Sequence, residues 1–152
     1  RLQIHPIDGI TLLNDAYNAN PNSMRAALET VAQLTTEGRR VAVLGDMLEL
    51  GESAARYHRE IGELASKCKL DLLACVGEQA ALIARTAQDA SMPARSIHCF
   101  DDSAEAARQI PRWLRRGDLV LLKASRGIHL ETVAQAIADQ APRFGRRVKV
   151  AS

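Results

Sequence analysis

Short apolar runs alternate with segments of helical spacing along most of the chain. Two of these runs, residues 2–7 and 10–13, flank the dipeptide Asp8-Gly9, which is typical of a two-residue hairpin turn. Pro6 has no backbone N–H to donate, so the pattern predicts that this hairpin lies at a sheet edge. Four further runs are short, apolar and followed by polar or glycine residues, as in strands buried on both faces of a parallel sheet. They span residues 41–44, 72–76, 97–100 and 119–122.

Five other segments place apolar residues three and four positions apart, which is the spacing of an amphipathic helix. They span residues 24–34, 57–68, 79–87, 106–114 and 130–141. Asn20 followed by Pro21 is typical of a helix start, since asparagine caps free N–H groups and proline has none to leave unpaired. Asp102 with Glu105 resembles a capping box. The alternation predicts an α/β fold with one mostly parallel sheet, an N-terminal edge hairpin and helices on both faces.

Composition and charge narrow the class of protein. A length of 152 residues with 47% hydrophobic and 25% charged residues suits one ordinary globular domain, here residues 1–152. A formal net charge of +2 gives no electrostatic case for binding nucleic acid. No apolar run approaches the roughly 20 residues that span a bilayer, and no signal-peptide pattern opens the chain. The basic residues after Pro142 are expected to form a solvated tail, with a possible edge strand at 148–150.

Three cysteines, one histidine and one tryptophan lie in apolar segments of the sequence. Cys68, Cys75 and Cys99 lack C-x-x-C spacing, which predicts three reduced, buried thiols in a cytosolic protein. His58 precedes Ile61 by one turn on an apolar face and is predicted to be a partly buried histidine with its hydrogen bonds satisfied. Trp113 lies at helical spacing and is predicted to belong to the core.

The polar turns share one position, directly after a strand. In an open parallel sheet these turns gather at the carboxyl edge, where such sheets bind ligands. The turn at 14–23, NDAYNANPNS, fits either helix capping or a polar rim that holds a ligand. The turn at 45–52, GDMLELGE, offers carboxylates for an amine or a magnesium ion, or is an exposed connection whose leucines pack back. The turn at 123–127, KASRG, suits a carboxylate or phosphate because it precedes a helix, with a solvated basic turn as the alternative.

Several common motifs are missing from the sequence. No turn contains a Walker A sequence, and no G-x-G-x-x-G fingerprint follows the first strand, so dinucleotide binding is unsupported. No cluster of His, Cys or Asp has metal-ligand spacing. The sequence therefore predicts no catalytic residue and no metal ligand within this chain.

Three of these segments together resemble the C-terminal domain of the Mur ligases. They are residues 15–24 (DAYNANPNSM), 43–51 (VLGDMLELG) and 122–127 (LKASRG). The resemblance runs from Arg1 to about Pro142 and is closest to the branch of the family that adds D-alanyl-D-alanine. Two positions depart from the family pattern: Ala124 stands where glycine is usual, and Asn14 stands where an aspartate is common.

The resemblance implies a three-domain cytoplasmic enzyme of peptidoglycan synthesis whose N-terminal and central domains are not in this chain. The central domain would carry the P-loop and the Mg²⁺ ligands. The C-terminal domain, with its Rossmann-like sheet, would close over ATP and bring in the dipeptide. ATP would phosphorylate the terminal carboxylate of UDP-MurNAc-tripeptide, and the amine of D-alanyl-D-alanine would displace the phosphate. On this interpretation the chain alone is inactive.

The resemblance also implies roles for nine residues. Those that match the motif approaching the nucleotide are Asp15, Tyr17, Asn18 and Asn20. Those that match the loop facing the acceptor peptide or the dipeptide carboxylate are Lys123, Ser125 and Arg126. Those that match a further loop bordering the same cleft are Asp46 and Glu49.

Two other interpretations stay open. One is a related amide ligase, either a folylpolyglutamate synthase or the diaminopimelate-adding Mur ligase. The string YNANP at 17–21 speaks against both, because those relatives have a histidine there. The other is a binding domain without a catalytic role, and an upstream glycine-rich Lys-Ser/Thr loop would decide against it.

Overall fold

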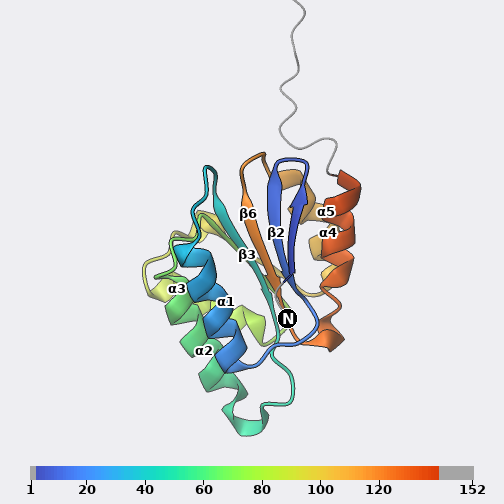
Figure 1. The fold of residues 1–152 in the computed structure, drawn as a ribbon. Helices are drawn as coiled ribbons and strands as arrows, with labels where there is room; N and C mark the ends of the chain where they lie inside the picture. The colour runs from blue at the N-terminus through green and yellow to red at the C-terminus, as the bar shows by residue number, and fades with distance from the viewer. Residues whose placement is uncertain (1–2, 141–152) are drawn as a thin grey trace, which may run out of the picture.

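A six-stranded sheet runs through the centre of the molecule in the order β1-β2-β6-β3-β4-β5 (Figure 1). The computed structural model describes residues 3–140. The strands are β1 (Gln3–Ile7), β2 (Ile10–Asp15), β3 (Arg40–Gly45), β4 (Leu72–Val76), β5 (Ile97–Phe100) and β6 (Leu119–Lys123). β1 pairs antiparallel with β2, and all the other neighbouring pairs among these strands are parallel. The predicted parallel sheet with an edge hairpin is confirmed.

Helices cover both faces of the sheet, as predicted (Figure 1). On one face lie α1 (Pro21–Gln33), α2 (Ala54–Ala65) and α3 (Ala80–Asp89), and on the other lie α4 (Ser103–Trp113) and α5 (Glu131–Gln140). Short 3-10 turns occupy η1 (Gly51–Ser53), η2 (Ala94–Ser96) and η3 (Arg126–Ile128). The helix predicted at 57–68 begins earlier and ends at Ala65, although Cys68 beyond it is still buried.

The central strands are buried on both faces, which explains their continuous apolar sequences. In β3, Ala42 and Leu44 pack against α1, α2 and α3, while Val41 and Val43 pack toward α4 and α5. A different layer of helices shields each set of side chains from water, so both faces of the strand carry apolar residues. The molecule therefore has two apolar cores separated by the sheet.

Two helices begin with the caps that the sequence predicts. Asn20 accepts the backbone N–H of Ser23 on its side-chain oxygen at 2.9 Å, and Ser23 Oγ accepts the backbone N–H of Asn20 at 3.0 Å. At the start of α4, Asp102 accepts the N–H of Glu105 at 2.9 Å. These bonds satisfy N–H groups that a helix start leaves without an intrahelical partner.

Two of the burial predictions are wrong in part. Cys68 and Cys75 are buried free thiols, but Cys99 is exposed because β5 is the outermost strand of its side of the sheet. Trp113 is only half-buried, with its ring stacked on Phe100 at a centroid distance of 5.6 Å near the same edge. The predicted strand at 148–150 and the basic tail lie outside the described residues. Among the helices of residues 3–140, none is long and apolar enough to cross a bilayer.

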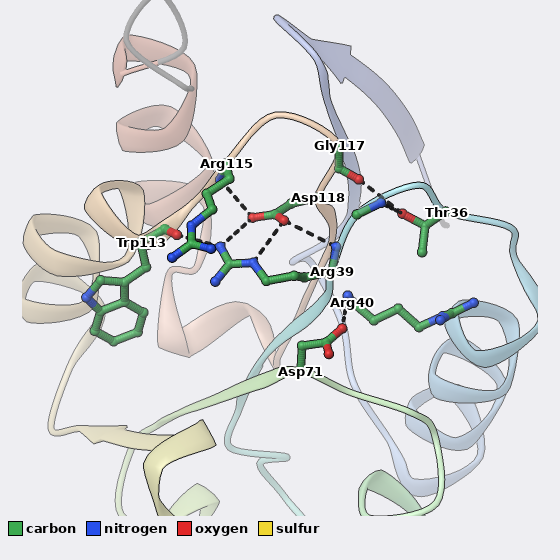
Figure 2. A network of polar contacts seen from close by, with 9 residues as sticks. Thr36, Arg39, Arg40, Asp71, Trp113, Arg115, Gly117 and Asp118 are labelled. Carbon is green, nitrogen blue, oxygen red and sulfur yellow. Dashed lines mark hydrogen bonds and ion pairs between the residues drawn. The ribbon is translucent and has the colours of Figure 1, made fainter. Parts of the chain in front are cut away.

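A polar network closes the amino ends of the central strands (Figure 2). Asp118, just before β6, is 1% exposed and accepts from Arg39 Nε at 3.1 Å and Nη2 at 2.8 Å. The same Nη2 donates to the carbonyl of Trp113 at 2.6 Å. Arg40 donates to the carbonyls of Val31 and Leu34 at the end of α1. These contacts of Arg39, Arg40 and Asp118 join the starts of β3 and β6 to the ends of α1 and α4, at the edge of the sheet opposite the polar turns.

Candidate site at the carboxyl edge of the sheet

A buried ion pair joins the ends of β2 and β6. Asp15 and Lys123 are partners in the parallel register, and Lys123 Nζ donates to Asp15 Oδ2. The same ammonium group donates to the carbonyl of Asn18 at 3.0 Å, and Lys123 is 1% exposed. A buried charge requires such partners, because leaving water is costly for an ion. The alternative of a solvated basic turn is therefore wrong for Lys123, and its predicted contact with substrate stays a prediction.

Ser125 connects the three polar turns. Its hydroxyl accepts the N–H of Leu48 at 2.8 Å and lies 3.4 Å from the carbonyl of Ala19, to which it donates. Its own N–H donates to the carbonyl of Asp46 at 3.0 Å. The residue is 8% exposed, so these bonds form in a largely water-free position. The three motifs that are far apart in sequence are thereby fixed against one another.

The side chain of Asp46 is hydrogen-bonded to the start of α3. Its Oδ1 accepts the N–H of Ala80 at 2.6 Å, and the residue is 7% exposed. A carboxylate is favoured there by the partial positive charge of the helix N-terminus. Gly77 approaches this carboxylate so closely that an added Cβ would lie 2.5 Å from Oδ1, and its φ of +113° also favours glycine. Asp46 thus has a structural role, and its predicted place in a ligand site is untested.

The described residues do not fit a magnesium site. Within residues 3–140, no three His, Cys, Asp or Glu side chains gather as metal ligands would. Asp46 is occupied by the helix start, while Glu49 lies exposed on the turn with a φ of +63°. Of the two alternatives for this turn, the packed connection is partly right: Leu50 packs against the core, but Leu48 is 42% exposed.

A pocket of about 240 Å³ lies where the three turns meet. Its lining residues are Asn18, Ala19, Leu48, Glu49, Ser125, Arg126 and Gly127. Arg126 and Glu49 are both exposed and bring opposite charges to it. Four larger pockets, of about 340 to 560 Å³, lie elsewhere on the described residues, and none of the predicted site residues lines them. The chemistry at the carboxyl edge therefore singles out the smaller pocket.

The structure brings together four of the nine predicted site residues as pocket lining: Asn18, Glu49, Ser125 and Arg126. Tyr17 lies nearby in sequence and is 56% exposed, and its predicted contact with nucleotide stays a prediction. The Asn20 side chain is engaged in the cap of α1. Asp15 and Lys123 do not line the pocket, but Lys123 donates to the carbonyl of Asn18, which does.

His58 contributes to this edge in a way that the sequence did not indicate. It is fully buried, with Nδ1 2.6 Å from the carbonyl of Ala54 and Nε2 accepting the N–H of Met47 at 3.0 Å. The prediction of satisfied hydrogen bonds is confirmed, whereas the prediction of partial burial is wrong, because the side chain is completely enclosed. The sequence analysis did not predict that His58 contacts the turn at 45–52. The one hint in the sequence was a polar side chain on an otherwise apolar helix face.

Comparison with known proteins places this geometry in a family. Residues 1–126 match the family described as Mur ligase, glutamate ligase domain. The chain belongs to the Mur ligase family. It is 36% identical over 140 residues to the UDP-N-acetylmuramoyl-tripeptide–D-alanyl-D-alanine ligase of Bacillus subtilis, covering 91% of this chain and 30% of that protein. It is 40% identical over 147 residues to the ligase of that name from Mycobacterium tuberculosis, covering 86% and 29%.

Solved structures of Mur ligases show the same fold. MurF ligase from Thermotoga maritima, in complex with ADP, aligns with a TM-score of 0.77 and 27% identity over 94% of this chain and 31% of that chain. MurF from Acinetobacter baumannii aligns with a TM-score of 0.80 and 29% identity, covering 91% and 30%. These matches confirm the predicted family and the Rossmann-like sheet. This Mur ligase chain spans about three tenths of the length of the curated relatives it matches.

Proposed function

We propose that this chain is the C-terminal domain of an ATP-dependent ligase that joins D-alanyl-D-alanine to UDP-MurNAc-tripeptide. The observation that carries the proposal is the junction of three motif turns by Ser125, which leaves Arg126 and Glu49 at one pocket. The two relatives compared above, which are named for this reaction, share 36% and 40% of their aligned residues with the chain. A solved relative is in complex with ADP, which supports a nucleotide as a substrate of the whole ligase.

The proposed reaction needs an activated carboxyl group. The γ-phosphoryl group of ATP passes to the terminal carboxylate of the tripeptide, which gives an acyl phosphate and ADP. The amine of the dipeptide then attacks the acyl carbon, the bond from that carbon to the phosphate oxygen breaks, and the amine loses a proton. The products are an amide and inorganic phosphate. Closing a domain over the acyl phosphate excludes water that would hydrolyse it.

The exposed side chains of the pocket suit the charged ends of these substrates. The guanidinium of Arg126 can hold a carboxylate through two parallel hydrogen bonds. The carboxylate of Glu49 can meet the ammonium group of an incoming dipeptide. We assign the nucleotide to the side of the first turn, where Tyr17 and Asn18 are exposed. Mg²⁺ is expected to be held by residues of another domain, since the described residues offer no fitting cluster.

The test uses the full-length protein that carries this chain. Incubation with ATP, UDP-MurNAc-tripeptide and D-alanyl-D-alanine is expected to give the pentapeptide product by mass spectrometry, with one phosphate released per bond. Parallel reactions supply diaminopimelate with its dipeptide acceptor, or glutamate with a folate. Ligation only in one of these reactions would establish the related amide ligase instead. Absence of ligation in all of them would favour a binding domain without a catalytic role.

The isolated chain provides a second test. We expect it to hydrolyse no ATP and to bind ATP with a Kd of about 1 mM or weaker, which is about −4 kcal/mol or less favourable. The sequence has no Walker A loop to hold the phosphates. Micromolar ATP binding by calorimetry, or magnesium-dependent ATP hydrolysis, would show that the chain has its own phosphate site.

A further inference from the structure

The imidazole of His58 links helix α2 to the turn that carries Glu49. His58 is fully buried, and both of its ring nitrogens meet backbone groups. Nε2 accepts the N–H of Met47 at 3.0 Å, and Nδ1 lies 2.6 Å from the carbonyl oxygen of Ala54. A backbone N–H can only donate and a carbonyl can only accept, so this arrangement requires a neutral imidazole with its proton on Nδ1.

The N–H that His58 accepts belongs to the centre of the turn. On one side of Met47, the carbonyl of Asp46 accepts the N–H of Ser125 at 3.0 Å. On the other side, the N–H of Leu48 donates to Ser125 Oγ at 2.8 Å. Three consecutive residues of the turn are therefore held, two by the loop after β6 and one by α2. Glu49 follows directly, at the rim of the pocket.

Other contacts also hold the turn, namely the Asp46 carboxylate at the start of α3 and the packing of Met47 and Leu50 in or against the core, but none of them accepts the N–H of Met47. Glycines stand at both ends, Gly45 and Gly51, and both Gly51 and Glu49 have positive φ angles. Leu48 is 42% exposed, so packing of its side chain contributes little to holding the turn. Met47 is 1% exposed, and an N–H buried there without an acceptor would be costly, which favours a different path for the backbone.

We infer that His58 is a positioning residue for the candidate site. It holds Met47 so that the turn at 46–49 stays against the loop at 125–127 and Glu49 stays at the pocket that Arg126 also lines. The structural part of this inference rests on the contacts alone. Its consequence for catalysis rests on the proposed function, because it assumes that the dipeptide binds in this pocket.

Two substitutions of similar size separate this role from simple packing. In His58→Gln, the amide oxygen can reach the place of Nε2 and accept the N–H of Met47. In His58→Asn, the amide group can reach only the place of Nδ1, where it donates to Ala54. Both variants lose the imidazole ring, but only His58→Asn loses the bond to the turn.

The first measurement is amide hydrogen exchange by NMR on the 152-residue chain. We expect exchange at Met47 and Leu48 to be at least tenfold faster in His58→Asn than in His58→Gln, with the exchange of Ala74 in β4 alike in both variants. Equal exchange at the turn in both variants would overturn the inference. In the unsubstituted chain, ¹⁵N shifts are expected to show the proton of His58 on Nδ1. A proton on Nε2 would overturn it without requiring either variant to fold.

The second measurement is steady-state kinetics on the full-length ligase. We expect His58→Asn to raise KM for D-alanyl-D-alanine by tenfold or more relative to His58→Gln, with a smaller change in kcat. If exchange at the turn differs but the KM values agree, the role in positioning the site is wrong. If the unsubstituted enzyme makes no amide bond, the proposed function fails, while the exchange result still decides whether His58 holds the turn.

Discussion

The ammonium group of Lys123 lies against the carboxylate of Asp15, at the start of the first polar turn. The two residues end adjacent strands, and Lys123 also donates to the carbonyl of Asn18 at 3.0 Å. The lysine side chain is 1% exposed and that of the aspartate 11% exposed. Lys123, from the turn at 123–127, thus holds the backbone of the turn at 14–23, so a substitution in either turn is expected to alter both.

Removal of one charge from this pair is expected to destabilise the fold strongly. Lys123→Met removes the buried ammonium group that contacts the Asp15 carboxylate and the Asn18 carbonyl, which should cost about 3–5 kcal/mol of unfolding free energy. Asp15→Asn combined with Lys123→Met should recover part of that loss, because no buried charge is then left. Urea denaturation measures both variants.

The control for this prediction is an exposed ion pair. Arg25 and Glu60 lie 3.8 Å apart with side chains 50% and 43% exposed, so Glu60→Gln should cost about 1 kcal/mol or less. Equal losses in Glu60→Gln and Lys123→Met would contradict the buried character of the Lys123 pair.

The cap formed by Asn20 is expected to be separable from any contact with nucleotide. Asn20→Ala removes the acceptor for the Ser23 N–H and should cost about 0.5–2 kcal/mol of stability. Asn20→Asp keeps an oxygen in place and should retain most of that stability. Thermal unfolding compares the two variants. If Asn20→Asp keeps the stability but weakens ATP binding by the full-length enzyme, the residue also contacts the nucleotide.

Gly45 and Ala124 are expected to be complementary in size. A Cβ added at Gly45 would lie 2.6 Å from the Cβ of Ala124 and 2.9 Å from a methyl group of Ile128. Gly45→Ala should therefore cost about 1–3 kcal/mol through overpacking. Ala124→Gly in the same chain removes the closest contact and should recover part of this loss. Unfolding curves of the single and double variants test this; purely additive effects would refute it.

The three thiols are expected to differ in reactivity. Cys99 is exposed, whereas Cys68 and Cys75 are buried, so a disulfide reagent should label Cys99 first in the folded chain. Partial burial raises the pKa of the Cys99 thiol, which lowers the thiolate fraction near neutral pH. Labelling should therefore be slower than for a small free thiol at pH 8 and should keep accelerating as the pH rises further. Equal labelling of all three in the folded chain would contradict this.

The sequence predicted those parts of the fold that depend on local pattern. Apolar runs gave the parallel strands because both faces of the sheet are covered, and Asn20 with Pro21 gave the start of α1 because capping acts within one turn. The gathering of polar turns at one edge followed from strand direction alone. Cys99 was misjudged because its exposure depends on strand order, which the apolar run at 97–100 does not contain.

The hydrogen-bond and ion-pair partners of the polar side chains could not be predicted from local pattern. The partner of Lys123 lies 108 positions earlier in the sequence, and Arg39 and Asp118 are 79 positions apart. A lysine after a strand looks solvated until its partner is placed beside it. The nine proposed site residues therefore divide in the structure between those that build the pocket and those that face it.

Arg126 is an exposed cation of the pocket, which under the proposed function would meet a substrate carboxylate. It is exposed, while its neighbours Lys123 and Ser125 are buried in contacts with other turns. In the full-length enzyme, Arg126→Ala should lose a charge-assisted contact of about 1.5–3 kcal/mol, or roughly tenfold to a hundredfold in kcat/KM. Arg126→Lys keeps the charge without the two parallel hydrogen bonds and should recover only part of the activity.

Stability separates this role from support of the loop. Because the Arg126 side chain is exposed, Arg126→Ala should leave the Tm nearly unchanged, whereas Ser125→Ala, which removes the acceptor for the Leu48 N–H, should lower it. Steady-state kinetics with D-alanyl-D-alanine and with UDP-MurNAc-tripeptide as the varied substrate would show which carboxylate Arg126 meets. A lowered Tm with unchanged kinetic constants would make Arg126 a brace for its own loop and place the acceptor site elsewhere.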